Sequence, residues 1–134
     1  MTADETAPFA PTLRQVGVAH TPYETPDDAP HQGFADDAES EIEVFDEYAD
    51  ALAGLADAVR VTVVYWAHLA DRTAEVRSDG HGPFARRSPT RPNPLSICVC
   101  TLYGIDGQTL RVGGLDAVDG SPVLDLKPSL QTER

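Results

Sequence analysis

Lysine is almost absent from this sequence of 134 residues, because Lys127 is the only lysine among ten basic residues. The 22 acidic residues leave a net charge of −12. A protein that binds nucleic acid without specificity needs a broad basic face, and this composition argues against that class. A large net charge keeps a protein soluble where salt screens repulsion. We therefore expect an acidic, salt-adapted protein.

Cysteine is also scarce, and long apolar runs are missing. Cys98 and Cys100 are the two cysteines. On a strand they would point the same way, too close for an ordinary structural disulfide and without partners for a zinc site. The four histidines have no metal-ligand spacing. We predict reduced core cysteines, no metal, no membrane association and a cytoplasmic location, since transmembrane runs and signal segments are lacking too.

The acidic residues are concentrated in the first part of the chain. Residues 1–58 hold 14 acidic residues and one basic residue, Arg14, whereas residues 59–134 hold 8 acidic and 9 basic residues. Asp79 is the single acid within a group of four cations: Arg77, Arg86, Arg87 and Arg91. An anionic partner is expected to approach the protein at this group.

The proline-rich run Gly82–Pro94 carries three of these arginines. Its four prolines fix φ at their own positions and push the preceding residues out of the α region. The run is therefore predicted to be a stiff loop, and its forked cationic donors suit a phosphate, a carboxylate or a nucleotide edge. The alternative is a surface linker with solvated arginines, which fits poorly with the apolar strand Leu95–Leu102 that follows directly.

Alternation of apolar and polar residues, with turn residues between the segments, predicts about six strands. They cover residues 12–19, 41–45, 59–68, 95–103, 110–112 and 122–127. Because there is no βαβ alternation, we predict an all-β fold, a small and mostly antiparallel closed barrel at residues 12–131. Residues 1–11 are expected to form a disordered tail.

One short helix is predicted after the second strand. Asp46 can cap it, and it would run to Leu55 with Tyr48 and Leu52 on its buried face. A turn is expected at residues 104–107, where two glycines flank Ile-Asp.

Several motifs occur in an order that is typical of one protein family. They are Val16-Gly-Val-Ala-His-Thr-Pro-Tyr23, Pro30-His-Gln32, Leu52-Ala-Gly-Leu55, Tyr65-Trp-Ala-His68, Phe84-Ala-Arg-Arg-Ser-Pro-Thr-Arg-Pro-Asn-Pro94 and Leu115-Asp-Ala-Val-Asp-Gly-Ser-Pro-Val-Leu-Asp-Leu-Lys-Pro128. On these motifs the chain resembles the TsaA-like (YaeB-like) family of tRNA methyltransferases over nearly its whole length. The resemblance implies a small β-barrel that forms a homodimer. It also implies methyl transfer from S-adenosylmethionine to N6 of the threonylcarbamoyl-adenosine next to the tRNA anticodon.

The resemblance implies a set of cofactor contacts near the dimer contact. They are Gln32, Gly33, Phe34, His68, Leu69, Arg87, Ile97, Gly113, Gly114, Leu115 and Asp116. We further predict that tRNA is contacted by Arg86, Arg91, Asn93, Asp119 and Lys127, while no residue is assigned to catalysis. The sequence has no Gly-x-Gly-x-x-Gly run after a strand, so the cofactor is not expected to be held in the Rossmann manner.

Simpler structural roles are open for several candidates. They are a core histidine (His68), a plain turn (Gly113 and Gly114), a turn cap (Asp116 and Asp119) and a strand ion pair (Asp125 with Lys127). Tyr65 and Trp66 are expected in the core. A function of another class is also open, namely a non-catalytic barrel that binds a nucleotide or an RNA strand. Binding of S-adenosylmethionine to the purified protein would discriminate between the two classes.

Overall fold

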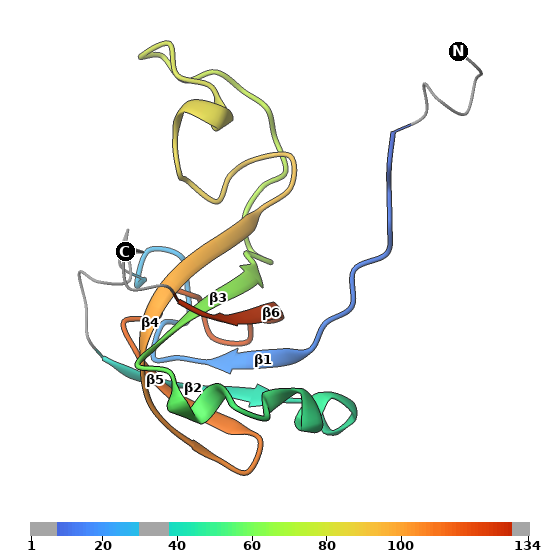
Figure 1. Ribbon diagram of the computed structural model, residues 1–134. Coiled ribbons are helices and arrows are strands. Elements are labelled where there is room, and N and C mark those ends of the chain that lie inside the picture. The colour runs from blue at the N-terminus through green and yellow to red at the C-terminus, as the bar shows by residue number, and fades with distance from the viewer. Residues whose placement is uncertain (1–7, 30–37, 130–134) are drawn as a thin grey trace.

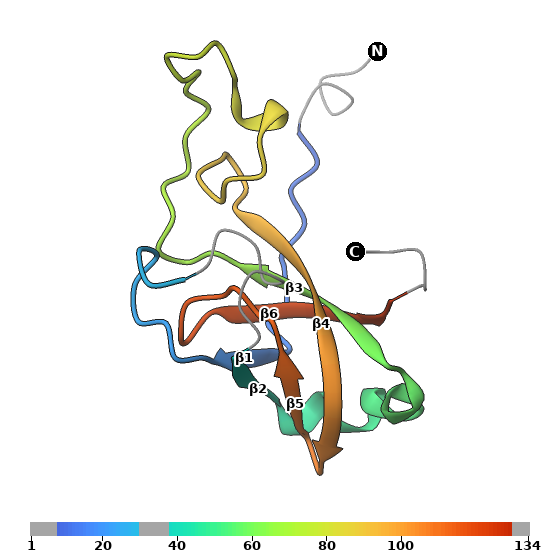
Figure 2. The same ribbon diagram turned by 90° about the vertical axis from the view of Figure 1, so that its left-hand side faces the viewer.

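The computed structural model describes residues 8–29 and 38–129, and six strands form its framework. The strands are β1 (Gly17–His20), β2 (Glu39–Val44), β3 (Arg60–Trp66), β4 (Leu95–Asp106), β5 (Thr109–Gly113) and β6 (Pro122–Pro128). All neighbours are antiparallel, and the order β1-β2-β5-β4-β3-β6 closes into a barrel (Figures 1 and 2). The predicted all-β barrel is confirmed.

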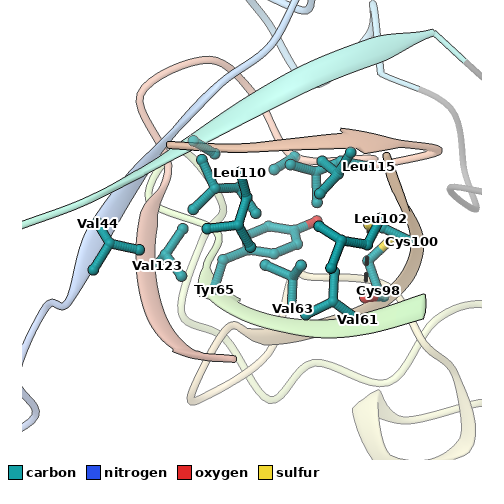
Figure 3. Close-up of a cluster of buried hydrophobic side chains, with 14 residues drawn as sticks. Val44, Val61, Val63, Tyr65, Cys98, Cys100, Leu102, Leu110, Leu115 and Val123 are labelled. Atoms are coloured by element: carbon teal, nitrogen blue, oxygen red, sulfur yellow. Dashed lines mark hydrogen bonds between the residues drawn. The ribbon is translucent and has the colours of Figure 1, made fainter. Parts of the chain in front are cut away.

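Alternating side chains build the core inside this barrel. In β2, Ile42 and Val44 are buried while the three glutamates of the strand face solvent, as the period of two requires. The other strands and the turn after β5 supply most of the remaining core side chains (Figure 3). Cys98 and Cys100 are buried free thiols with their sulfur atoms 3.9 Å apart, so their predicted place in the core is confirmed.

The first strand is shorter than predicted. β1 begins at Gly17 rather than Thr12, because its register with β2 begins at that residue. The backbone N–H of Val16 donates to the carbonyl of Val123, but residues 8–15 lead away from the barrel without regular secondary structure (Figure 1). Residues 1–7 of the expected tail lie outside the described residues.

The fourth strand is longer than predicted, because residue 104 does not begin a turn. Gly104 lies inside β4, at a shift of register against β5. A Cβ there would come within 2.7 Å of Nη2 of Arg111, so this glycine makes room for a cross-strand side chain. The turn is instead a tight hairpin at residues 107 and 108, with Gly107 at φ +63°.

The helical region after β2 forms two short 3₁₀ helices, η2 (Asp46–Leu52) and η3 (Leu55–Asp57). Gly54 between them has φ +88°, a left-handed conformation that ends a helix. Tyr48, Leu52 and Leu55 pack against the core on one face, as predicted. The predicted cap is wrong, because Asp46 lies inside η2, Phe45 holds the cap position, and no side chain bonds there.

Residues 67–94 form a projecting segment between β3 and β4. The segment rises from the end of the barrel opposite η2 and η3, then returns to β4 (Figures 1 and 2). Its regular structure is a single turn, η4 (Pro83–Ala85), so the prediction of a loop is confirmed, while its stiffness stays a prediction. Within the part of the chain that is described, no helix has the length and apolar character needed to cross a bilayer.

Candidate functional site

An open cavity of about 1810 Å³ lies between the projecting segment and the barrel. Its walls come from β3, β4, the residues that follow β5, and the projecting segment. Sites for small molecules usually measure roughly 300–1,000 Å³. The cavity therefore has room for a cofactor and for part of a second ligand.

A partly buried carboxyl, that of Asp116, lines this cavity. The hydroxyl of Tyr65 donates a 2.7 Å hydrogen bond to Oδ1 of Asp116. Burial raises the pKa of Asp116, and the hydrogen bonds from Tyr65 and Cys98 and the nearby charge of Arg87 oppose that rise in part. Burial and the neighbouring carboxyl raise the pKa of Tyr65 well above its ordinary value, so the phenol stays a donor. The carboxyl is thus held in one orientation and would gain from a cationic ligand.

The two cysteines lie next to this carboxyl. Sγ of Cys98 is 3.2 Å from the carbonyl oxygen of Gly114, and the thiol also reaches Asp116. The hydrogen bond with Cys98 and burial raise the pKa of Cys100. Cys100 therefore stays a thiol, which is a poor nucleophile.

Gly113 and Gly114 have different local constraints. A Cβ on Gly113 would lie 2.8 Å from Cζ of Tyr103, so the ring of Tyr103 occupies the space that a side chain would need. Tyr103 is half exposed on the outward face of β4 and lines the cavity. Gly114 has φ +84°, which favours glycine for conformational reasons. Glycine is therefore favoured at position 114 by the backbone conformation of a plain turn, and at position 113 by the ring of Tyr103 that packs against it.

Arg72 fixes the two ends of the projecting segment to each other. Its Nε donates to the carbonyl of Pro92 at 2.7 Å, and its Nη2 donates to Oδ1 of Asn93 at 2.9 Å. The guanidinium also lies 5.2 Å from the centre of the Trp66 ring, within the range of a cation–π contact.

Arg86 and Arg91 hold the inner turns of the same segment. Arg86 donates to the carbonyls of His81 (2.6 Å) and Glu75 (3.3 Å). Arg91 donates to the carbonyls of Arg86 and Ser88, each at 3.0 Å. These charge-assisted bonds satisfy backbone groups that have no sheet or helix partners. The stiffness predicted from proline is thus reinforced by arginine.

The cavity brings together seven of the eleven predicted cofactor residues. They are His68, Leu69, Arg87, Ile97, Gly113, Gly114 and Asp116. His68 is exposed on the cavity wall, so the alternative of a buried core histidine is wrong. Leu115 points into the core and is 1% exposed. Gln32, Gly33 and Phe34 lie outside the described residues, and all eleven roles stay predictions.

The predicted tRNA-contacting residues fall into two groups. Arg86, Arg91 and Asn93 line the cavity, but their side chains are engaged within the projecting segment. Asp119 accepts a hydrogen bond from the backbone N–H of Thr21 at 3.0 Å, as a turn cap would. Lys127 pairs with Asp125 at 3.0 Å on an exposed part of β6. The structural alternatives for Asp119 and the Asp125–Lys127 pair are therefore realised, and neither Asp119 nor Lys127 lines the cavity described here.

Sequence reasoning missed the polar contacts of the site. Tyr65 is in the core as expected, but its hydroxyl reaches a carboxyl 51 residues away. Trp66 is only half buried, because it faces outward on β3. Tyr103 had no assigned role, although an exposed aromatic residue beside Gly-Gly could have suggested one. Among the described residues, no group of three or more His, Cys, Asp or Glu side chains could hold a metal.

The profile of the tRNA-methyltransferase O N-terminal domain matches residues 18–132. The chain belongs to this family. The match covers the cavity walls and almost the whole barrel, so the resemblance deduced from the motifs is confirmed.

Relatives within the family differ in length. A probable S-adenosyl-L-methionine-binding protein of Methanothermobacter thermautotrophicus is 46% identical, over 87% of this chain and 88% of the relative. The tRNA (adenine(37)-N6)-methyltransferase of Escherichia coli is 33% identical, over 88% of this chain and 57% of the relative. The crystal structure of TrmO from Pseudomonas aeruginosa aligns with a TM-score of 0.80 and 26% identity, over 93% of this chain and 57% of that chain. The present chain thus spans little more than half the length of the latter two proteins.

Proposed function

We propose that this protein is an S-adenosylmethionine-dependent methyltransferase that modifies N6 of the threonylcarbamoyl-adenosine next to the tRNA anticodon. The observation that carries the proposal is the cavity, which gathers residues predicted to bind the cofactor from three separate segments of the chain. Membership of the family, and the names of the relatives in Methanothermobacter and Escherichia coli, support the same cofactor and the same class of substrate.

The residues of the cavity fit the charges of S-adenosylmethionine. The cofactor has a cationic sulfonium and an α-carboxylate, and it supplies an activated methyl group. Asp116 is a largely buried carboxyl that favours a cationic neighbour. Arg87 is an exposed guanidinium on the cavity wall, suited to a carboxylate. The ring of Tyr103, which lies over Gly113, offers an apolar face on the same cavity wall.

Methyl transfer from a sulfonium is an in-line displacement, so the protein contributes mainly by positioning and by exclusion of water. The fixed Tyr65–Asp116 bond and the arginine-braced segment supply rigid walls for that purpose. One proton must leave N6 during the reaction. Asp116 and His68 are the titratable groups on the cavity wall that we consider for this role.

We also propose that the protein acts as a homodimer in the cytoplasm and that its acidic surface is an adaptation to high salt. Large apolar side chains remain exposed around the cavity, namely Leu69, Phe84, Leu95, Ile97 and Tyr103. Exposed apolar side chains gathered around one cavity are typical of a contact with another molecule. A two-fold contact along β4 would place the cofactor near the interface.

The experiment that tests the function compares tRNA nucleosides from a wild-type strain and a strain that lacks the gene. We expect the N6-methyl group on threonylcarbamoyl-adenosine to vanish in the deletion strain and to return with the wild-type gene. An unchanged nucleoside profile in the deletion strain would contradict the proposal and would favour a barrel that binds without catalysis.

A further inference from the structure

The arginines of the projecting segment divide into two groups. Arg72, Arg86 and Arg91 bond to acceptors of the segment itself. Arg77 and Arg87 line the cavity, and neither makes a side-chain hydrogen bond or ion pair with a residue in the described ranges. Arg87 lies close enough to Asp116 to affect its pKa. Arg77 is therefore a second cation on the cavity wall, and it is not among the residues proposed to bind the cofactor.

The backbone around Arg77 is fixed. Its N–H donates to the carbonyl of His81, and its own carbonyl accepts from the N–H of Gly80, both at 2.9 Å. Arg86 clamps the same turn through the carbonyls of Glu75 and His81. Because the turn is braced, binding of an anion costs little backbone entropy there, although the exposed side chain of Arg77 still loses rotamer freedom.

An exposed aromatic ring lies on the neighbouring turn. Phe84 is 89% exposed and lines the same cavity. It belongs to η4, in which Pro83 is buried and the N–H of Ala85 donates to the carbonyl of Gly82. Arg86 follows that turn directly and ties it to the turn of Arg77. The ring is thus held outward on a rigid support.

We propose that Arg77 and Phe84 form a nucleotide subsite, in which Phe84 stacks on a base of the RNA substrate and Arg77 binds an anionic group of it. This inference rests on the proposed function, and it names residues that bind the substrate of that reaction. Arg77 and Phe84 line the same cavity on two turns that Arg86 ties together, and cationic donors combined with exposed aromatic rings are what hold single-stranded nucleic acid. The size of the cavity leaves space for such a ligand beside a cofactor.

The anion has two possible sources with the same chemistry toward a guanidinium. One is a backbone phosphate, and the other is the carboxylate of the threonylcarbamoyl group. A phosphate contact would release a counterion, so its loss would lower the slope of log affinity against log salt by about one. A carboxylate contact would matter only for RNA that carries the modification.

The experiment measures affinity for an anticodon stem-loop, with and without threonylcarbamoyl on adenosine 37, in the full-length protein. Arg77→Ala should weaken binding about ten- to a hundredfold, and Phe84→Ala should weaken it about tenfold or more while Phe84→Trp restores it. Arg111→Ala and Phe9→Ala are matched controls, because both residues lie off the cavity wall and neither should change RNA affinity. Affinity for S-adenosylmethionine, measured by calorimetry, should stay at the wild-type value in all four alanine variants.

If Arg77→Ala lowers affinity for both RNAs and also lowers the salt slope, the anion bound by Arg77 is a backbone phosphate. If affinity falls only for the modified RNA, the anion is the carboxylate. Wild-type affinity of Arg77→Ala and Phe84→Ala for both RNAs would overturn the subsite. A changed molecular mass of Phe84→Ala with intact RNA binding would also overturn it, because the ring would then be a subunit contact. If the wild-type protein methylates RNA while these variants bind RNA normally, the subsite fails and the proposed function stands. If the wild-type protein binds no S-adenosylmethionine, the proposed function itself fails.

Discussion

The hydroxyl of Tyr65 donates a 2.7 Å hydrogen bond to Oδ1 of Asp116, and this bond joins the barrel wall to the turn after β5. Tyr65 is 6% exposed and its ring packs in the core (Figure 3). The carboxyl that it holds lines the cavity. One contact thus connects the packing of the barrel with the electrostatics of the site.

Asp116→Asn should separate the charge of this group from its structural role. Asparagine keeps an oxygen that can accept the bond from Tyr65, but it removes a buried negative charge. Affinity for S-adenosylmethionine should fall about tenfold or more, as for a lost charge-assisted contact, while stability at neutral pH should not fall. Calorimetry with the cofactor and urea denaturation measure the two effects.

The raised pKa of Asp116 makes the stability of the protein depend on pH in a definite direction. The folded pKa of Asp116 is raised above the ordinary 3.8, so the folded state binds more protons than the unfolded state between those two values. The contribution of Asp116 to stability therefore decreases as pH rises through that window and stays low above it. Asp116→Asn should lack this decrease. A wild-type protein and variant with parallel pH–stability profiles would show that the carboxyl is not in the buried state described.

Arg87→Ala and Arg86→Ala should affect two different properties, cofactor affinity and the order of the projecting segment. Arg87 makes no bond within the projecting segment, so its loss should weaken cofactor binding about ten- to a hundredfold and leave the segment ordered. Arg86 holds two carbonyls, so its loss should speed proteolysis and amide hydrogen exchange of residues 71–94. Cofactor calorimetry and hydrogen exchange separate the two variants. The same loss of affinity with unchanged exchange in both would show that the register within the loop is wrong.

Much of the barrel could be predicted, because the residue pattern that specifies a strand lies within the strand itself. The alternation of Ile42 and Val44 with glutamates specifies a strand and its inward face without any knowledge of partners. The turn predicted to begin at Gly104 was wrong. In sequence, a glycine that accommodates a cross-strand arginine looks the same as a glycine that begins a turn. The distinction depends on the register between β4 and β5, which sequence spacing does not contain.

The site was harder to predict than the fold, because its polar contacts depend on the whole topology. The sequence indicates that Arg86, Arg87 and Arg91 are cations on a stiff loop, but not which of them can reach a backbone carbonyl. The structure gives that role to Arg86 and Arg91. Likewise, the bond between Tyr65 and Asp116 exists only because β3 and the turn after β5 meet at one end of the closed barrel.

The proposed homodimer predicts a mass of about twice the 14.4 kDa chain by light scattering. Leu95→Glu should shift the protein toward the monomer, because it places a charge within the exposed apolar surface of β4. Val59→Glu is the control, since Val59 is 75% exposed but does not line the cavity. A wild-type monomer that is fully active at micromolar concentration would contradict the dimer.

Activity should persist, or rise, as salt concentration increases. High salt weakens contacts between arginine and phosphate, but it also screens the repulsion between tRNA and the acidic residues of the first part of the chain. With few phosphate contacts, the two effects oppose each other and the salt slope stays shallow. Initial rates over a range of potassium chloride concentrations measure it. A fall as steep as that of a broadly basic RNA-binding protein would refute this explanation of the charge distribution.

The most direct test of the central claim is methyl transfer by the purified protein. The chain is incubated with labelled S-adenosylmethionine and tRNA that carries threonylcarbamoyl-adenosine 37, and the tRNA is digested and its nucleosides are identified by mass. We expect one labelled methyl group on N6 of that nucleoside, and a much lower rate with Arg87→Ala. A protein that binds the cofactor and the tRNA at saturating concentrations but leaves the nucleoside unmethylated would contradict the central claim.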